Sequence, residues 1–359
     1  MKTCGIISEY NPFHNGHKYQ LQQVREMGYS HIVCVMSGDF VQRGDIAIND
    51  KYIRAENAVK NGADLVLMLP TKYTLSSAEL FAQNGVDLLN SVGIEALCFG
   101  SECGDVDKLI LLANKQINPK EYLKQGMSYP KAIGLCYGED LLSNDILAIE
   151  YIKAIGKKNI TPIALNRIGV NHDSQTACNN IASASCIREL MFNHKDFSEY
   201  VPENCNINSP ITLESIEKLI LYKLKSLTAQ QLCDYAEVSE GLNNRIYNAA
   251  SQAVNIGQFY DLLKTKRYPM ARLKRIVCCI LLDIKKNSLV ENSPRVLAFN
   301  QKGAEIIKKY NLTVNFKDYY DEHYENLISD INASEIFSLC SNLPKGKDFT
   351  TKIKMINSD

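Results

Sequence analysis

The chain has 359 residues, and its 40 Lys and Arg balance its 40 Asp and Glu, so its formal net charge is zero. Hydrophobic residues make up 45% and charged residues 22%, which excludes a disordered or fibrous protein and fits an ordinary globular one of about two domains. A neutral chain argues neither for nor against a nucleic-acid partner, because only a local basic patch would do so.

Cysteine usage and the apolar runs indicate the compartment. The 12 cysteines form no C-x-x-C pair, and several lie in apolar, strand-like runs, where a free thiol behaves as a small hydrophobe. This distribution favours a reducing cytoplasm over a disulfide framework, and it offers no zinc ligand set with the usual spacing. We find no signal-peptide pattern and no apolar run of membrane-spanning length, so we expect a cytoplasmic protein.

The N-terminal part alternates short apolar runs with amphipathic stretches. Strands are expected over residues 4–8, 31–36, 64–69, 96–100 and 161–165, and helices over residues 18–27, 51–61, 77–91 and 144–157. This alternation is typical of βαβ units, so we predict a doubly wound α/β domain whose parallel sheet is covered on both faces. Ligands of such domains bind at the carboxyl ends of the strands.

The first expected strand is followed by the most informative motif of the chain, Ser8-Glu9-Tyr10-Asn11-Pro12-Phe13-His14-Asn15-Gly16-His17. A helix is expected directly after it, and the N–H groups and dipole of a helix N-terminus attract anions. His14 and His17 can donate to phosphate oxygens, and Gly16 lets a nucleotide approach the backbone. The H-x-G-H pattern is that of the nucleotidyltransferase superfamily and predicts ATP binding. The alternative is two ordinary surface histidines at a helix start.

Polar residues also follow later strands of the predicted sheet. Residues 100–102, Gly-Ser-Glu, come after the fourth strand, where Gly100 could allow an adenine or ribose to pack on the backbone; a plain turn would look the same. Arg167 follows the fifth strand, with His172 and Asp173 just beyond it. Its guanidinium could bind phosphate through two donors or form an ordinary ion pair, and its place at a strand end favours a functional role.

A second candidate phosphate site is the run Ser183-Ala184-Ser185-Cys186-Ile187-Arg188, which enters an expected helix. A serine at a helix start normally caps the helix, and that alone would explain either serine. The first turn of a helix also binds phosphate, and Ser185 and Arg188 are three residues apart, on one face. We therefore favour Ser185 as a phosphate ligand and Arg188 as a group that stabilises phosphate charge.

The pattern changes after about residue 195 and becomes almost wholly helical beyond the polar, turn-rich segment 204–210. Helices are expected over residues 213–225, 229–236, 240–254, 271–286, 301–309 and 333–340. We predict two domains, a nucleotide-binding domain over residues 1–204 and a mainly α-helical domain over residues 205–359.

The helical part contains the densest basic tract of the chain. Residues 264–275 hold six positive side chains, no acidic one and one aromatic residue, Tyr268. Such a tract can hold a nucleic-acid backbone while the aromatic ring stacks on a base, although a basic run is more often a solvated face. The candidate nucleic-acid-binding residues are Lys264, Lys266, Arg267, Arg272, Lys274 and Arg275.

Together these motifs make the chain resemble the tRNA(Met) cytidine acetate ligases along nearly its whole length. The resemblance is carried by residues 9–17 (EYNPFHNGH), 35–44 (VMSGDFVQRG), 61–66, 99–102 and 146–151, and by shorter blocks at 50–55, 166–169, 240–245, 270–272 and 295–297. The two long blocks are far more specific than H-x-G-H alone.

The resemblance implies an enzyme that forms acetyl-adenylate from acetate and ATP. The acetyl group then passes to N4 of the wobble cytidine of elongator tRNA(Met). It places ATP contacts on Ile7, Glu9, Tyr10, Asn11, Phe13, His14, Asn15, Gly16, His17, Gln20, Gly100 and Arg167. An ATP-contacting asparagine of the family falls on Asn144 or its neighbour Asp145, and we choose Asn144.

We expect His14, His17 and Arg188 to stabilise the charge that develops when acetate attacks the α-phosphorus. Magnesium is expected with the phosphates, and no protein nucleophile or resident metal site is needed. Three alternatives stay open. They are a nucleotidyltransferase that adenylylates a small phosphorylated metabolite, a noncatalytic nucleotide-sensing RNA-binding protein, and an acetyl-CoA-dependent acetyltransferase. The oligomeric state and the residues of the acetate pocket are not predicted.

Overall fold

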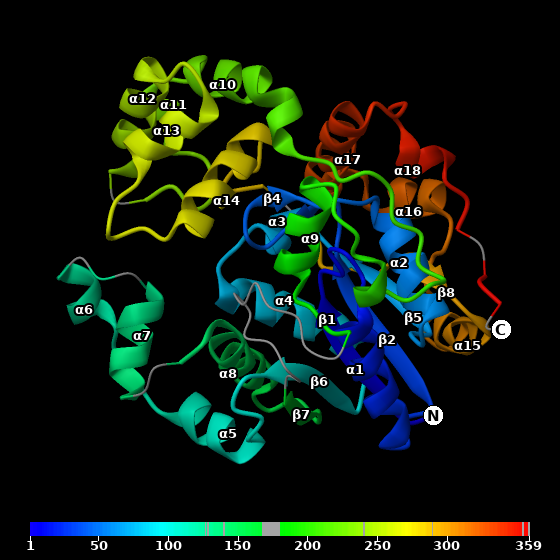
Figure 1. Cartoon of the computed structure of the whole chain (residues 1–359). Coiled ribbons are helices and arrows are strands. Elements are labelled where there is room, and N and C mark those ends of the chain that lie inside the picture. Colours follow the sequence, from blue (N-terminus) through cyan, green and yellow to red (C-terminus); the bar gives the residue numbers. More distant parts are fainter. Residues whose placement is uncertain are drawn as a thin grey trace.

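The structure is a computed structural model that describes residues 1–125, 127, 129–138, 141–166, 180–239, 241–288, 290–353 and 355–357. A twisted sheet with helices on both faces forms its centre, and a group of helices from the second half of the chain gathers beside it (Figure 1). None of the described helices combines the length and the hydropathy that a bilayer span would require.

The central sheet has six strands in the order β7-β6-β1-β2-β5-β8. They are β1 (Thr3–Ser8), β2 (His31–Ser37), β5 (Leu65–Leu69), β6 (Ala96–Ser101), β7 (Thr161–Asn166) and β8 (Arg295–Phe299). The first five pair in parallel, and β8 runs antiparallel to β5. The chain builds the sheet outward from β1 in both directions, so the strand order reverses between β1 and β6. In open α/β sheets this reversal opens a crevice at the carboxyl ends of the strands.

Helices cover both faces of the sheet, which confirms the doubly wound architecture. In the first part of the chain they are α1 (Asn15–Glu26), α2 (Lys51–Lys60), α3 (Thr71–Thr74), α4 (Ala78–Ser91), α5 (Val106–Asn114), α6 (Lys120–Lys124), α7 (Tyr129–Tyr137), α8 (Ser143–Ile155) and α9 (Ala184–Phe192). Alternate strand residues point to opposite faces. Ile6 and Cys34 therefore pack in one core with α1 and α2, whereas Val35 and Leu67 pack in another with α4 and α8.

Among the described residues from Leu213 onward, β8 is the one named strand and the other regular elements are helices. Its helices are α10 (Glu217–Lys225), α11 (Ala229–Leu232), α12 (Leu242–Gln252), α13 (Ile256–Leu263), α14 (Met270–Leu281), α15 (Gln301–Lys309), α16 (Phe316–His323), α17 (Ile328–Ser341) and α18 (Lys347–Thr350). Helices α10 to α14 enclose a separate core with α17. The expectation of an almost wholly helical segment missed β8, because its short apolar run, residues 296–299, has no readable period and its partner β5 is remote in sequence. The predicted boundary between residues 204 and 205 stays a prediction.

A short hairpin joins the two halves of the molecule. It is formed by β3 (Phe40–Val41) and β4 (Asp45–Ile46), and Phe40 and Ile46 are buried in the core that α10 to α14 enclose. At its turn, Gly44 has φ +78°, and a Cβ there would lie 2.3 Å from the backbone nitrogen of Arg275 in α14. A glycine is therefore required, since any side chain would push the hairpin away from α14.

A buried ionic network ties the C-terminal helices to the sheet domain. The ammonium of Lys51 lies 2.7 Å from carboxylate oxygens of both Asp39 and Asp348, and the guanidinium of Arg295 lies 2.9 Å from Asp348. All four side chains are at most 4% exposed. The hydroxyl of Ser334, on α17, donates to Asp39 at 2.9 Å. Charges this deeply buried are tolerated only when each has a partner, so the network fixes how α17 and α18 sit on the sheet domain.

Candidate active site

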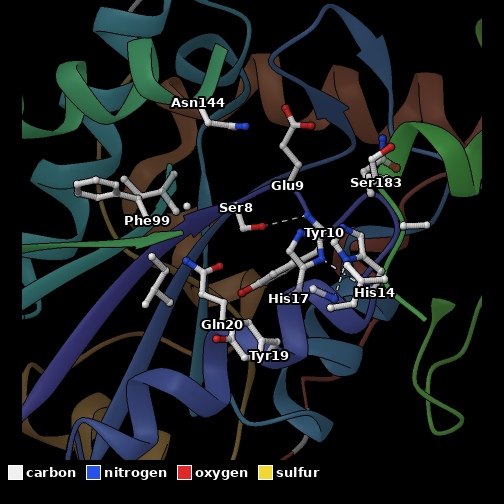
Figure 2. Close-up of a pocket in the computed structure, with 18 of the residues that line it drawn as sticks. Ser8, Glu9, Tyr10, His14, His17, Tyr19, Gln20, Phe99, Asn144 and Ser183 are labelled. Atoms are coloured by element: carbon white, nitrogen blue, oxygen red, sulfur yellow. Dashed lines mark hydrogen bonds between the residues drawn. The ribbon is translucent and has the colours of Figure 1, made fainter. Parts of the chain in front are cut away.

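A cavity of about 260 Å³ lies in the crevice between β1 and β6, as the topology predicts (Figure 2). Most of the predicted ATP-contacting residues line it, namely Ile7, Glu9, Tyr10, Asn11, His14, Gly16, His17, Gln20, Gly100 and Asn144. In Figure 2, Phe99 and Asn144 lie on one side of the cavity, and His14 and Ser183 lie on the other. The sequence motifs are therefore brought together by the carboxyl edge of the sheet.

The two histidines of the motif form a stacked pair at the start of α1. His14 is the N-cap residue, and its Nδ1 accepts from the backbone N–H of Gly16 at 3.1 Å. His17 is the third helical residue, and its Nδ1 accepts from the backbone N–H of His14 at 3.3 Å. This reciprocal arrangement is a capping box built from imidazoles. A ring nitrogen that accepts a hydrogen bond carries no proton, so each ring has its N–H at Nε2.

The glycine of the motif is required by His14 itself. A Cβ at Gly16 would lie 3.0 Å from Cε1 and 3.1 Å from Nδ1 of the His14 ring, closer than ordinary van der Waals contact. Gly16 therefore lets His14 fold back over the helix start, in addition to lining the cavity. The H-x-G-H spacing thus produces one compact group of two imidazoles at a helix N-terminus.

Two aromatic residues of the same motif, Tyr10 and Phe13, pack against the ring of His17. Tyr10 is buried, its ring meets His17 edge-on at 4.8 Å between centroids, and its hydroxyl lies 3.2 Å from Sγ of Cys34. Burial raises the pKa of Tyr10 well above its ordinary value, so the phenol stays neutral. Phe13 is fully buried 5.5 Å from His17 and does not line the cavity. Phe13 therefore packs beside His17, and its predicted ATP contact stays a prediction.

Asn15 also points away from the cavity. Its side-chain amide donates to the carbonyl oxygens of Asn180 and Glu199, both at 2.9 Å, and so ties α1 to the segment around α9. The motif therefore divides into residues that face the cavity and residues that hold it in place.

Asn144 and Asp145, the two candidates for the asparagine contact to ATP, have different environments at the start of α8. Asn144 lines the cavity and donates to the carboxylate of Glu102. Asp145 is 5% exposed and accepts from Ser101 Oγ at 2.5 Å, and from the backbone N–H groups of Glu102 at 2.9 Å and Cys103 at 3.2 Å. Asp145 is therefore committed to the turn after β6, and Asn144 is the residue of the pair placed to meet a ligand.

Several residues that shape this edge of the sheet were not singled out as site residues. Ser8, Tyr19, Phe99, Leu165, Asn166, Ile181, Ala182, Ser183 and Ala184 also line the cavity. Ser183 caps α9 by accepting a hydrogen bond from the N–H of Cys186 at 3.1 Å. Of the two serines in this run, Ser183 lines the cavity and Ser185 does not. Strand ends gave a signal for Ser8 and Asn166, whereas residues 181–184 reach the cavity only through the tertiary fold.

Arg54 is a further residue without a predicted role. It is fully buried, and its guanidinium donates to four backbone carbonyls, those of Glu9 at 2.6 Å, Asn49 at 3.0 Å, Ser37 at 3.2 Å and Gly38. Burial lowers the pKa of Arg54 to about 10. The Glu9 carbonyl follows β1, and the Ser37 and Gly38 carbonyls lie at the end of β2. Arg54 therefore links the turn after β1 to the turn after β2. Its signal in the sequence was a charged residue within the buried face of α2.

A second, larger cavity of about 750 Å³ adjoins the first and shares Glu9 and Asn11 with it. Arg188 lines this second cavity rather than the first. Its guanidinium donates to the Asn11 carbonyl at 2.7 Å and to Ser185 Oγ at 3.1 Å. The structure thus brings Ser185 and Arg188 into contact, as their spacing predicts. Arg188 also contacts the histidine motif at Asn11, on the side of the second cavity.

The basic tract separates into exposed and buried members. Lys264 and Arg267 are exposed before α14, and Lys266 lies between them. Arg275 is only 8% exposed and lies 3.2 Å from the Glu237 carboxylate. Tyr268 is also buried, with the guanidinium of Arg272 over its ring at 5.2 Å, so this ring is not placed to stack on a base.

The remaining two members of the tract lie at the edge between the halves of the molecule. Arg272 donates to the Ser239 hydroxyl at 2.7 Å, and Lys274 lies 3.2 Å from Asp45 at the wall of the second cavity. Arg167, with His172 and Asp173, lies outside the described residues, so its predicted phosphate contact stays a prediction.

Comparisons with known proteins agree with this geometry. The family model for the HIGH Nucleotidyl Transferases matches residues 1–352. A tRNA(Met) cytidine acetate ligase of Clostridium perfringens (strain ATCC 13124) is 38% identical over 94% of this chain and 95% of its own length. One of Clostridium kluyveri is 40% identical over 86% of this chain and 87% of its own.

A solved structure extends the agreement to three dimensions. The crystal structure of Thermotoga maritima TmcAL bound with alpha-thio ATP superposes with a TM-score of 0.88 at 26% identity, and the match covers 100% of both chains. The apo form of the same protein gives a TM-score of 0.89 at 27% identity. From its fold, its stacked histidine motif and these relatives, the chain belongs to the HIGH nucleotidyltransferase family and, within it, to the tRNA(Met) cytidine acetate ligases.

Proposed function

We propose that this enzyme joins acetate to ATP, forming acetyl-adenylate and pyrophosphate, and then transfers the acetyl group to N4 of the wobble cytidine of elongator tRNA(Met) in the cytoplasm. The observation that carries the proposal is the stacked pair of His14 and His17 at a helix N-terminus that lines a cavity at the topological switch point. The acceptor is taken from the names of the relatives, and the ATP from the ligand of the Thermotoga maritima structure.

The first step needs charge stabilisation more than covalent help from the protein. An acetate oxygen attacks the α-phosphorus, and the bond from that phosphorus to pyrophosphate breaks. Because the Nδ1 atoms of His14 and His17 accept backbone N–H groups, their Nε2–H groups are the donors that would meet the phosphate oxygens. The N-terminus of α1 adds its dipole in the same place. Arg188 would contribute its charge from the side of the second cavity.

Contacts to the rest of ATP follow from the cavity wall. Asn144, at the start of α8, lies opposite the histidines (Figure 2), and Gly100 lies near the end of β6. We assign both to the nucleoside end together with Gln20. Magnesium would enter with the triphosphate. Within the described residues no group of three or more His, Cys, Asp or Glu is placed to hold a metal ion. The phosphates and water would therefore supply most ligands of the magnesium ion.

The decisive experiment is ATP–pyrophosphate exchange with purified protein, measured with and without acetate and before tRNA is added. Exchange that depends on acetate is expected, because formation of acetyl-adenylate is reversible. If exchange is absent, the assay is repeated with tRNA present, which covers a site that the RNA completes. Absence of acetate-dependent exchange under both conditions would overturn the proposal in favour of a metabolite adenylyltransferase or an RNA-binding protein.

A further inference from the structure

Apart from Glu9, Asn11 and Arg188 at its border with the first cavity, the second cavity has no assigned role, and it is the larger of the two. It lies between the β3–β4 hairpin, the C-terminal end of α9, residues 211–214 and the first turn of α14. At about 750 Å³ it is in the range of pockets that bury a whole drug-sized ligand. Acetate is far smaller than such a ligand and does not account for a space of this size.

The lining of the cavity suits a nucleobase with its sugar and phosphate. Phe192 is 46% exposed at the wall and so offers an aromatic face on which a base can stack. Positive groups, Arg188 and Lys274, stand at the wall together with carboxylates, Glu9 and Glu214. Carboxylates accept the N4 amine of cytosine, and cations bind phosphates.

The cavity also lies beside the reaction centre. Glu9 and Asn11 line both cavities, so the two spaces border each other at the turn that follows β1. The turn is held from behind, because the Glu9 carbonyl accepts from Arg54 at 2.6 Å and the Asn11 carbonyl accepts from Arg188 at 2.7 Å. One oxygen of the Glu9 carboxylate accepts from the Gln42 N–H at 2.8 Å, which fixes the side chain at the boundary.

We propose that the second cavity receives one cytidine nucleotide that is extruded from the RNA loop, stacked on Phe192 and with its N4 amine beside Glu9. Single-stranded RNA loops are recognised through bases that are splayed out and stacked on aromatic side chains. Enzymes that modify a base take it out of its stack into a pocket of this kind. This inference rests on the proposed function and adds the site at which the acceptor is bound.

The placement gives a balanced transfer step. The N4 nitrogen forms a bond to the acetyl carbon, and the bond from that carbon to the phosphate oxygen of AMP breaks, with the electron pair leaving on AMP. The proton lost by N4 passes to the Glu9 carboxylate and from there to solvent. Transfer requires the amine and the acetyl carbon to approach to about 3–3.5 Å, so we place both reacting groups at the border of the two cavities, beside Glu9.

The test uses an anticodon stem–loop RNA with fluorescent aminopurine next to the target cytidine, whose emission rises when its neighbour leaves the stack. Ala271→Trp fills the cavity from the first turn of α14, and Phe192→Ala removes the stacking face. Phe192→Trp keeps an aromatic face. Tyr222→Ala is the matched control, because Tyr222 is 72% exposed on α10 and does not line the cavity. Exchange without RNA is measured for every variant.

We expect the emission to rise on binding to the wild type, Phe192→Trp and Tyr222→Ala, and the rise to be lost in Ala271→Trp. In Phe192→Ala, the RNA concentration needed for half of the rise should increase about tenfold, as expected for the loss of one stacked base. Acetate-dependent exchange should stay at the wild-type rate in all of them. If Ala271→Trp does not fold, Phe192→Ala against Phe192→Trp decides the matter.

A rise in Phe192→Ala with the same midpoint as in the wild type, or a rise that persists in a folded Ala271→Trp, would overturn the inference, as would RNA binding to the wild type without any rise. These outcomes are distinct from failure of the proposed function, which shows as missing acetate-dependent exchange in the wild type. The fluorescence signal would then still report whether a base enters the second cavity.

Discussion

The imidazole rings of His14 and His17 stack with their centroids 3.6 Å apart and their planes 21° from parallel. The stack is held from the backbone side, since each Nδ1 accepts a backbone N–H at the start of the helix. One motif therefore closes the helix end and presents two Nε2–H donors on the cavity side. This double use allows the structural role of His17 to be separated from its chemical role.

Replacing His17 by Gln should separate them. Gln at the third helical position can keep the capping box, so thermal stability should stay near that of the wild type. Acetate-dependent exchange should fall by about 100-fold or more, because an N–H donor to the reacting phosphate is lost. His17→Ala should lose the same activity and, in addition, about 1 kcal/mol of stability with the cap. Binding of tRNA should persist in both. Wild-type exchange in His17→Gln would refute the assignment.

Asn144 and its neighbour Asp145 should respond differently to substitution by Ala. Asn144→Ala removes a cavity-lining donor, so we expect a KM for ATP about tenfold higher in the exchange assay with little change in melting temperature. Asp145→Ala leaves three donors of the turn after β6 without their acceptor and should cost about 2–3 kcal/mol of unfolding free energy. The reverse pattern in urea denaturation and kinetics would transfer the ATP contact to Asp145.

The members of the basic tract that precede α14 should bind the tRNA backbone. Changing Lys264, Lys266 and Arg267 together to Gln should weaken tRNA binding. The slope of log affinity against log salt should fall by about 0.7 for each phosphate that is no longer neutralised. Exchange without tRNA should be spared, because these residues do not line the ATP cavity. Unchanged affinity across the salt series would remove them from the interface.

Arg275 is the matched contrast within the same tract. It is buried against Glu237, so Arg275→Met leaves this carboxylate with Arg272, 3.9 Å away, and should lower the free energy of unfolding by about 2 kcal/mol. Urea denaturation measures this decrease, and the salt slope of tRNA binding should match that of the wild type. A stable variant with a reduced slope would return Arg275 to the RNA interface.

The buried network around Asp348 should give a pH-dependent contribution to stability. Burial alone would raise the pKa of Asp348, but Arg295 and Lys51 outweigh it and hold this pKa well below the ordinary value of 3.8. A depressed folded-state pKa stabilises the protein above the ordinary value, and this stabilisation is lost as the pH falls through the folded-state pKa. Asp348→Asn should therefore cost about 3–5 kcal/mol at pH 7, since it leaves two buried cations short of a carboxylate partner.

Urea denaturation of wild type and Asp348→Asn checks this at several pH values. The difference in unfolding free energy should be equal at pH 7 and pH 5 and should shrink only below about pH 4. Asp330 gives the opposite sign, because burial raises its pKa, so its ionisation opposes folding as the pH rises. A difference for Asp348→Asn that vanishes already at pH 5 would contradict the depressed pKa.

Local pattern was enough to predict much of the fold and of the ATP cavity. The apolar runs that became β1, β2, β5, β6 and β7 are continuous and short, which is typical of strands buried on both faces. Because parallel strands end at the same edge, the motifs at residues 8–17 and 100–102 could be expected to lie together, and the family resemblance added the ATP contacts of residues 7–20 and Gly100. Phe13 and Asn15 belong to the same motif, yet their directions depend on what packs beside them, and the structure turns both away from the cavity.

The sequence by itself determined β1, the histidine motif after it and the following helix α1, because all three depend on residues that are close together in the chain. Only the tertiary structure decided that β8 joins the sheet, that Arg275 is buried, and that Glu9 and Asn11 stand between two cavities. Those features arise from contacts between segments that are remote in sequence, such as the contact of Gly44 with α14. The free energy of such contacts depends on the shape and burial of both segments, which a local sequence pattern does not predict.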